Sequence, residues 1–355
     1  MRAQLLIRMG DGERVQKPAE EVWEDLRSGT ADAAERGRIP ELNEEDLERL
    51  FDLFADPSKI VGVAPGEEVV VTDDACSSLY YLEQENSGQG LPMGRVQAAL
   101  TYERTTAADT VSIGHVDYSF KQVKPIINCE KSDYYSASLQ TTIPLFYGSQ
   151  PNMGLYFRPD GPFPNPAELM PTGKIAEARE AQEMAVETMT EDVVYIGREM
   201  YAVGCEGFNL DTSGSGGDAD FLAALQAVEG LKKVAPDMPV ELGMASEFVL
   251  GMHGEVAYQG TRLAGLFPHE QVRVAEEAGV DIFGPAINVH SGRSMPWNLA
   301  RTVTFVKETV ARATIPVHPN VGMGVCGVPM FEVPPVDAVT RVSKALVQIG
   351  KADGL

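Results

Sequence analysis

Short apolar runs alternate with longer segments of helical period through most of the chain beyond about residue 96. The short runs are rich in β-branched residues and have the length of buried strands, whereas the longer segments repeat their apolar residues every three to four positions. Apolar stripes over residues 221–231 and 336–347, the second entered through Pro335, predict crossover helices. Alternating strands and helices indicate an α/β fold with a parallel sheet. The strands are predicted at residues 110–113, 142–146, 208–211, 240–244, 281–285 and 315–318.

A weak internal repeat marks where strands begin. In residues 203–210 and again in residues 278–283, a glycine after a helical segment is followed by an acidic residue and an apolar strand. The same opening recurs at residues 349–355, so a seventh strand is begun there. A closed (β/α)8 barrel has eight strands. We therefore expect a TIM-type (β/α) barrel over residues 96–355 that is incomplete at its C-terminus.

The first 95 residues have a different pattern and are expected to form an N-terminal extension. Asn43, followed by three acidic residues and an apolar stripe, is typical of a helix N-terminus. Apolar runs at residues 60–63 and 69–72 flank Pro65-Gly66, which predicts a β-hairpin. The expected organisation is a helix and hairpin extension over residues 1–95, followed by the barrel domain.

Composition narrows the classes of function. With 29 Lys and Arg against 52 Asp and Glu, the formal net charge is −23, and such a polyanion repels nucleic-acid phosphates and anionic membranes. No apolar run reaches the length of a membrane span or of a signal-peptide core, so we expect a cytoplasmic protein. The 4 cysteines lie far apart without a Cys-x-x-Cys spacing, which predicts neither a zinc site nor a disulfide framework.

Several sequence blocks, collinear over nearly the whole chain, carry a family resemblance. They are RMGDG (residues 8–12), GTADAA (29–34), GHVDYSFK (114–121), IPLFYG (143–148), PNMGLY (151–156), LGMHG (250–254), WNLAR (297–301) and PPVDAVTR (334–341). In these blocks the chain resembles the dimethylamine:corrinoid methyltransferases of methylamine-using archaea and bacteria. Long blocks that occur in a single order make this resemblance specific.

The resemblance implies a TIM barrel and a reaction. In that reaction a methyl group moves from dimethylamine to the Co(I) of a separate corrinoid protein, in methylamine catabolism and methanogenesis, and methylamine remains. The resemblance also implies a pyrrolysine, encoded by an in-frame amber codon, directly after a segment like residues 353–355. The chain therefore resembles the product of an amber codon taken as a stop, and we expect it to be inactive by itself, to bind no metal and to depend on a corrinoid carried by the partner protein.

Candidate catalytic residues follow from the rule that barrel active sites collect at the carboxyl ends of strands. Glu247 follows the strand at 240–244, Asp211 ends the strand at 208–211, and Tyr147 directly follows the strand at 142–146. A carboxylate or phenol there could handle the proton of the amine. For Glu247 the alternatives are a helix N-terminal carboxylate or a surface charge. Polar residues near other strand ends are candidates for substrate binding, namely His115, Asp117, Asn288, His318 and Asn320.

Two other functions stay open on the residues alone. His115, Asp117, His318 and Asp211 could hold a metal in a barrel hydrolase, although the usual His-x-His on the first strand is missing. A glycine-rich segment after Asp211 lacks the Gly-Lys-Ser/Thr ending of a phosphate loop, and Asp218 at its end is expected to be the N-cap of the following helix. The third possibility is a non-catalytic binding or assembly protein. Because an unclosed barrel exposes strand edges, we expect a homo-oligomer.

Overall fold

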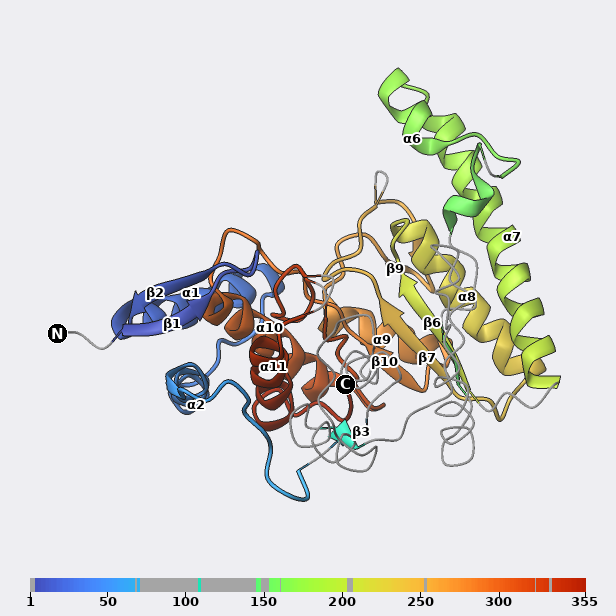
Figure 1. Cartoon of the computed structure of the whole chain (residues 1–355). Helices are drawn as coiled ribbons and strands as arrows, with labels where there is room; N and C mark the ends of the chain where they lie inside the picture. The colour runs from blue at the N-terminus through green and yellow to red at the C-terminus, as the bar shows by residue number, and fades with distance from the viewer. Residues whose placement is uncertain are drawn as a thin grey trace, which may run out of the picture. The chain divides into compact units, whose positions relative to one another are not determined.

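The computed structural model describes most of the chain except for the larger part of residues 71–152 (Figure 1). The described residues are 4–67, 69–70, 108–109, 145–147, 153–159, 161–202, 207–251, 254–322, 324–331 and 334–355. They belong to two compact units, one formed by Met1–Ser112 with Pro285–Leu355 and the other by Ile113–Gly284. The expected domain boundary at residues 95 and 96, like the predicted strand at 110–113, lies outside the described residues.

The unit Ile113–Gly284 is built on a parallel sheet of the strands β5 (Leu145–Tyr147), β6 (Gly207–Ser213), β7 (Val240–Met244) and β10 (Ile282–Gly284). Their order is β10-β7-β6-β5, so consecutive strands of this sheet are neighbours. Figure 1 shows β6, β7 and β10 side by side. The predicted α/β fold with a parallel sheet is confirmed, and each of these strands overlaps a predicted one. No closed barrel is formed by the strands that the structure describes.

Helices flank this sheet. Figure 1 shows α7 (Ile175–Ala202) beside α8 (Asp218–Val234), and the two helices are packed against each other. The stripe predicted over residues 221–231 lies in α8 and is buried. The N-cap of α8 is Gly217, and the expected cap Asp218 is instead the first helical residue. The remaining elements are η2 (Met153–Tyr156), α6 (Pro166–Leu169), η3 (Met170–Thr172), α9 (Pro268–Ala278) and the antiparallel pair β8 (Ala257–Tyr258) and β9 (Thr261–Arg262).

The other unit contains four helices among its described residues, together with an antiparallel hairpin of β1 (Gln4–Arg8) and β2 (Arg14–Pro18). The helices are α1 (Ala19–Gly37), α2 (Glu44–Ala55), α10 (Met295–Arg312) and α11 (Val336–Gln348). The predicted start of α2 is confirmed, because the Asn43 side chain accepts a hydrogen bond from the Asp46 backbone N–H at 2.9 Å. The predicted α11 begins directly after Pro335.

The internal repeat corresponds to a specific pair of hydrogen bonds. At the start of β10, the Asp281 backbone N–H donates to the Val240 carbonyl at 2.9 Å, and its carboxylate accepts from the Val240 N–H at 2.6 Å. In the other unit, Asp353 makes the same two bonds to Val317, at 3.1 and 2.9 Å. The acidic residue of the repeat thus ties each segment to the one that precedes it.

Two predicted strand features are wrong. Residues 60–64 form no strand, so the hairpin at 60–72 is absent although a turn is present at Pro65-Gly66. The Val61 backbone N–H instead contacts the Thr340 hydroxyl at 3.4 Å, and β3 (Val69–Val70) pairs in parallel with β4 (Ala108–Asp109). The segment 315–318 is also not formed as a strand, because only Val317 pairs, with the loop after α11.

Candidate active site

The two faces of the β6–β7 pair differ in polarity. Phe208 and Leu210 lie opposite Val240 and Leu242, and all four side chains are buried. The next residue of this face is Met244. A Cβ built on Gly214 would lie within 4 Å of both Met244 Cε and the Cβ of Phe221, so Met244 approaches the first turn of α8. The apolar face therefore packs on the α8 side of the sheet, and the alternate residues of both strands point to the other side.

That other face is polar and buried. Asn209 and Glu241 lie opposite each other, only 2% and 5% exposed. Asn209 Oδ1 has no hydrogen-bond partner among the described residues. A buried amide oxygen without a donor costs about 1–3 kcal/mol, and such groups are rare in proteins. The face therefore carries a polar group whose partner is missing from this part of the chain.

Oxygen atoms converge above Gly243 on the same face. A Cβ on Gly243 would lie 3.6 Å from the Leu210 carbonyl oxygen, 3.7 Å from Asn209 Oδ1 and 3.7 Å from Asp211 Oδ1. These three atoms are hydrogen-bond acceptors, and no donor is nearer to that point. Two of them already accept hydrogen bonds, the Leu210 carbonyl from the Ser213 hydroxyl and Asp211 Oδ1 from the Thr212 N–H. We name these three atoms the Gly243 oxygen cluster.

A β-bulge shapes the end of β6. The register shifts between Leu210 and Ser213, so β6 uses one more residue than β7 over the same stretch. Thr212 adopts a left-handed φ of 54° there, and the Ser213 hydroxyl donates to the Leu210 carbonyl at 3.2 Å. The Asp211 carboxylate accepts a hydrogen bond from the Thr212 N–H at 2.8 Å. Bulges of this kind re-aim side chains at the ends of strands, often beside active sites.

The loop after β6 is organised by Asp220 of α8. Its carboxylate is almost fully buried and accepts hydrogen bonds from backbone N–H groups, including that of Gly216 at 3.3 Å. Burial raises the pKa of Asp220 to about 6, although bonds from Gly216, Gly214, Met153 and Ser215 lower it. The side chain thus joins the loop to η2, which begins at Met153, and holds the carboxyl-terminal end of β6 in place.

A family model described as dimethylamine methyltransferase (Dimeth_PyL) matches residues 3–355. The chain belongs to the dimethylamine methyltransferase family. No solved structure is significantly similar to the chain. Among the described residues, no helix combines the length and the apolar character that crossing a membrane requires.

Two predicted catalytic residues of this methyltransferase family member lie on the described sheet. Tyr147 is the register partner of Asn209 at the end of β5, and Asp211 belongs to the Gly243 oxygen cluster. Because β5, β6 and β7 are parallel neighbours, their carboxyl ends meet at one edge of the sheet. A catalytic role of Tyr147 and Asp211 stays a prediction.

Glu247 lies three residues after β7 and is 3% exposed, so it is not a surface charge. It also does not begin a helix. Its backbone carbonyl accepts a hydrogen bond from the Gln271 amide of α9 at 3.3 Å, which anchors the loop that follows the sheet. A role of its carboxylate in proton transfer stays a prediction.

The substrate-binding candidates fall in different places. His115 and Asp117 lie outside the described residues. Asn288, His318 and Asn320 belong to the unit that contains Pro285–Leu355. Asn288 is exposed and pairs with Val325, the Asn320 N–H donates to the Pro285 carbonyl at 3.0 Å, and His318 is buried.

The metal alternative receives no support from the described part of the chain, where no group of three or more His, Cys, Asp or Glu side chains could hold a metal ion. Of the four cysteines, Cys326 is described, and it is a buried free thiol. Burial raises the pKa of this thiol to about 12.

Asn209 and Glu241 were missed by the sequence analysis. Both are polar residues inside short apolar runs, at positions that alternate with buried apolar residues. Strands of a parallel sheet are normally apolar on both faces, so a polar residue in the middle of such a run is itself a signal of a site. The sequence analysis considered only residues at the carboxyl ends of strands and therefore did not select these two residues.

Proposed function

We propose that this protein transfers a methyl group from dimethylamine to the cobalt of a corrinoid carried by a separate partner protein. The observation that carries this proposal is the family match over residues 3–355. The buried polar face of the β6–β7 pair supports it, because carboxylate and amide oxygens on a buried face suit a protonated secondary amine.

The chemistry requires the substrate nitrogen to be positively charged when the methyl group leaves, since a neutral amine is a poor leaving group. The partner's corrinoid supplies the Co(I) nucleophile. The chain's own contribution is to hold the ammonium, orient its methyl group and exclude water, which the burial of Asn209 and Glu241 favours. Glu247 and Asp211 are the carboxylates proposed to hold or move the proton, with the Tyr147 phenol as a further candidate.

We also propose that the sheet is part of a TIM-type (β/α) barrel. Across β5, β6, β7 and β10 the strand order shows no reversal. A singly wound barrel requires this order, whereas a doubly wound sheet reverses it at a crevice. A reversal of order in an experimental structure of the whole chain would contradict the barrel.

The remaining proposals concern the state of the protein. We propose that it is cytoplasmic, works in methylamine catabolism, forms a homo-oligomer and depends on a pyrrolysine. Sequencing the codons after Leu355 tests the pyrrolysine. Light scattering of the purified protein tests the oligomer.

The direct test of function is a spectroscopic assay. Protein produced with pyrrolysine incorporation is mixed with Co(I) corrinoid protein and dimethylamine, and methyl-Co(III) formation is followed by its absorbance. We expect methylation with dimethylamine and much slower methylation with methylamine or trimethylamine. If no methyl-Co(III) forms with any of the three amines, the proposed function is wrong.

Glu247→Gln tests the proton-transfer role. Removal of a proton-transfer group typically lowers the rate by roughly 10²- to 10⁴-fold, and we expect a loss in that range with an unchanged thermal unfolding midpoint. The matched control is Glu255→Gln, which alters an exposed glutamate paired with Arg179 and is expected to leave the rate unchanged. Near wild-type turnover in a folded Glu247→Gln variant would move the role to Asp211.

A further inference from the structure

We propose that Asp220 is a pH-sensitive latch, which holds η2 and the glycine-rich loop after β6 together and releases both when its carboxylate takes up a proton. The latch consists of the Asp220 carboxylate and the four backbone N–H groups that donate to it, those of Met153, Gly214, Ser215 and Gly216. This conformational device does not depend on the reaction proposed above.

The latch joins segments that follow two different strands. Met153 begins η2, which comes after β5, whereas residues 214–217 directly follow β6. Because β5 and β6 are parallel neighbours, both segments leave the sheet at the same edge. A single buried side chain of α8 thus holds two segments at the edge of the sheet where Tyr147 and Asp211 lie.

The loop is shaped around the carboxylate. Gly214 and Gly217 have φ values of 79° and 93°, which glycine adopts without steric cost. A Cβ on Gly216 would lie 3.2 Å from the Cβ of Asp220 and 3.4 Å from the Cβ of Met153, so these residues meet closely. Successive backbone N–H groups that turn toward one point form an anion-binding nest. The glycines that resemble a phosphate loop in the sequence therefore surround an anion that the chain itself supplies.

The hydrogen bonds of the latch depend on the charge of Asp220. An ionised carboxylate only accepts hydrogen bonds, whereas a protonated carboxyl group turns an O–H donor toward the same N–H groups and loses acceptor sites. Burial raises the pKa of Asp220 to about 6, so this change takes place near that pH. Because the pKa is higher in the folded than in the unfolded chain, proton uptake does not favour unfolding. It weakens the latch within a folded unit.

Other titratable groups lie on the elements packed against Asp220. Asp218 on α8 and Asp211 on β6 are further carboxylates, and like charges disfavour the ionised form of Asp220, as burial does. In η2, the Tyr156 hydroxyl donates to the Asp192 carboxylate of α7 at 2.7 Å. This bond anchors the far end of η2, so we expect opening to begin at Met153.

Hydrogen–deuterium exchange of the 355-residue chain tests the latch, because it reports local opening of backbone hydrogen bonds. Mass spectrometry follows the exchange between about pH 5 and about pH 8, with correction for the intrinsic pH dependence of amide exchange. We expect peptides covering residues 153–156 and 213–217 to lose protection together as the pH falls through about 6. The loss should be about tenfold or more, which corresponds to one hydrogen bond. The strand β7 should keep its protection.

Asp220→Asn removes the charge and places an amide NH2 group among the N–H donors. In this variant both peptides should exchange rapidly at every pH of the series, without the transition. The matched control, Asp237→Asn, removes an exposed carboxylate just after α8 and should keep the wild-type transition.

The latch is wrong if the wild-type chain shows no transition, if the transition persists in Asp220→Asn, or if only one of the two peptides loses protection. Loss of protection in β7 at the same pH would show general unfolding of the unit and would also contradict the latch. The wild-type pH series needs no substitution, so it tests the proposal even if Asp220→Asn does not fold.

Discussion

His318 is a buried histidine whose neutral form is favoured by its surroundings. Gly354 lies against its imidazole so closely that a Cβ at position 354 would overlap the ring. Burial lowers the pKa of His318 to about 4, while the Asp353 carboxylate raises it. The Asp353 carboxylate is itself held by the Val317 N–H at 2.9 Å. The segment 353–355 is thus fitted to a neutral ring at position 318.

Stability should therefore depend on pH through His318. Below its ordinary pKa of 6.5 the unfolded chain binds a proton that the folded protein does not take up until about pH 4. This contribution is therefore complete above pH 6.5 and is lost as the pH falls toward 4. Relative to a His318→Gln variant, the wild type should lose at most about 3 kcal/mol of unfolding free energy over this interval.

Urea unfolding of both proteins between pH 4 and about pH 7 measures this difference. Asp220 has the opposite effect in part of the range, because its raised pKa of about 6 favours folding at low pH. Since Asp220 is present in both proteins, its effect cancels in the comparison. A difference between the two proteins that does not change with pH would show that His318 is not the titrating group.

At the scale of elements, the contact between α1 and α10 depends on a glycine. A Cβ on Gly29 would lie well within 3.0 Å of the Trp297 carbonyl oxygen, so the two backbones approach closely there. Beside this contact, the Thr304 hydroxyl donates to the Thr30 hydroxyl at 2.9 Å, and the Arg301 Nε donates to Asp32 at 2.7 Å. The resulting pair of helices joins the N-terminal region to residues far along the chain.

Gly29→Ala should therefore destabilise the protein, although alanine is the better helix former by about 1 kcal/mol. Overpacking against backbone typically costs about 1–3 kcal/mol, and neither backbone can shift without disturbing the bonds of Thr304 and Arg301. We expect a lower thermal unfolding midpoint than in a control variant, Gly292→Ala, which adds the same methyl group into open space. An unfolding midpoint equal to that of the control would mean that α1 and α10 can move apart without a loss of unfolding free energy.

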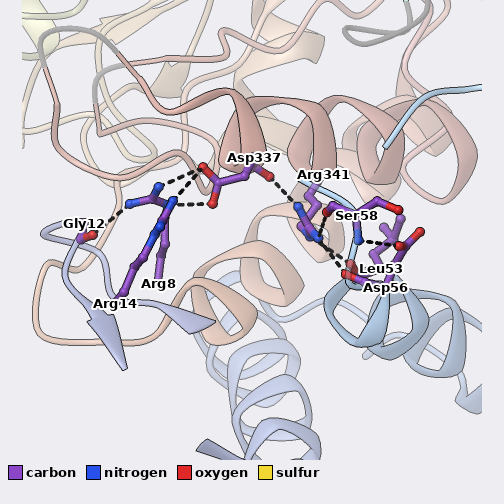
Figure 2. A network of polar contacts seen from close by, with 8 residues as sticks. All are labelled: Arg8, Gly12, Arg14, Leu53, Asp56, Ser58, Asp337 and Arg341. Atoms are coloured by element: carbon purple, nitrogen blue, oxygen red, sulfur yellow. Dashed lines mark hydrogen bonds and ion pairs between the residues drawn. The ribbon is translucent and has the colours of Figure 1, made fainter. Parts of the chain in front are cut away.

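At the scale of the molecule, a polar network connects both ends of the chain within one unit (Figure 2). The Asp337 carboxylate of α11 accepts hydrogen bonds from two nitrogens of Arg8 on β1, at 2.7 and 2.8 Å. One turn later, Arg341 donates to the backbone carbonyls of Leu53, Asp56 and Ser58, at 2.7–2.9 Å (Figure 2). The guanidinium thus fixes the end of α2 against α11.

Arg341→Lys should lose most of these bonds, because one ammonium group cannot reach carbonyls that a guanidinium contacts through several nitrogens. We expect the unfolding free energy to fall by roughly 1–3 kcal/mol in urea titration. The control Arg312→Lys changes an exposed ion pair with Glu308 within α10, which contributes little. A loss smaller than about 0.5 kcal/mol at Arg341 would contradict the role of the network.

Local pattern was sufficient for the elements whose partners lie nearby or whose period is long. The stripes of α8 and α11, the Asn43 cap and the strand β7 were predicted because each depends on residues within a few positions. The hairpin at 60–72 was wrong because Val61 finds its partner, Thr340, 279 residues away. No local pattern contains that information.

By itself, the sequence determined the α/β class, the family and the strands β5 and β6 to which Tyr147 and Asp211 belong. Only the tertiary structure decided which oxygens meet above Gly243, because that meeting depends on the register of β6 against β7 and on the bulge after Leu210. Register is set by hydrogen bonds between segments that are distant in the chain. The polarity of Asn209 is visible in the sequence, but the absence of a donor for its Oδ1 among the described residues becomes visible only once the strands have paired.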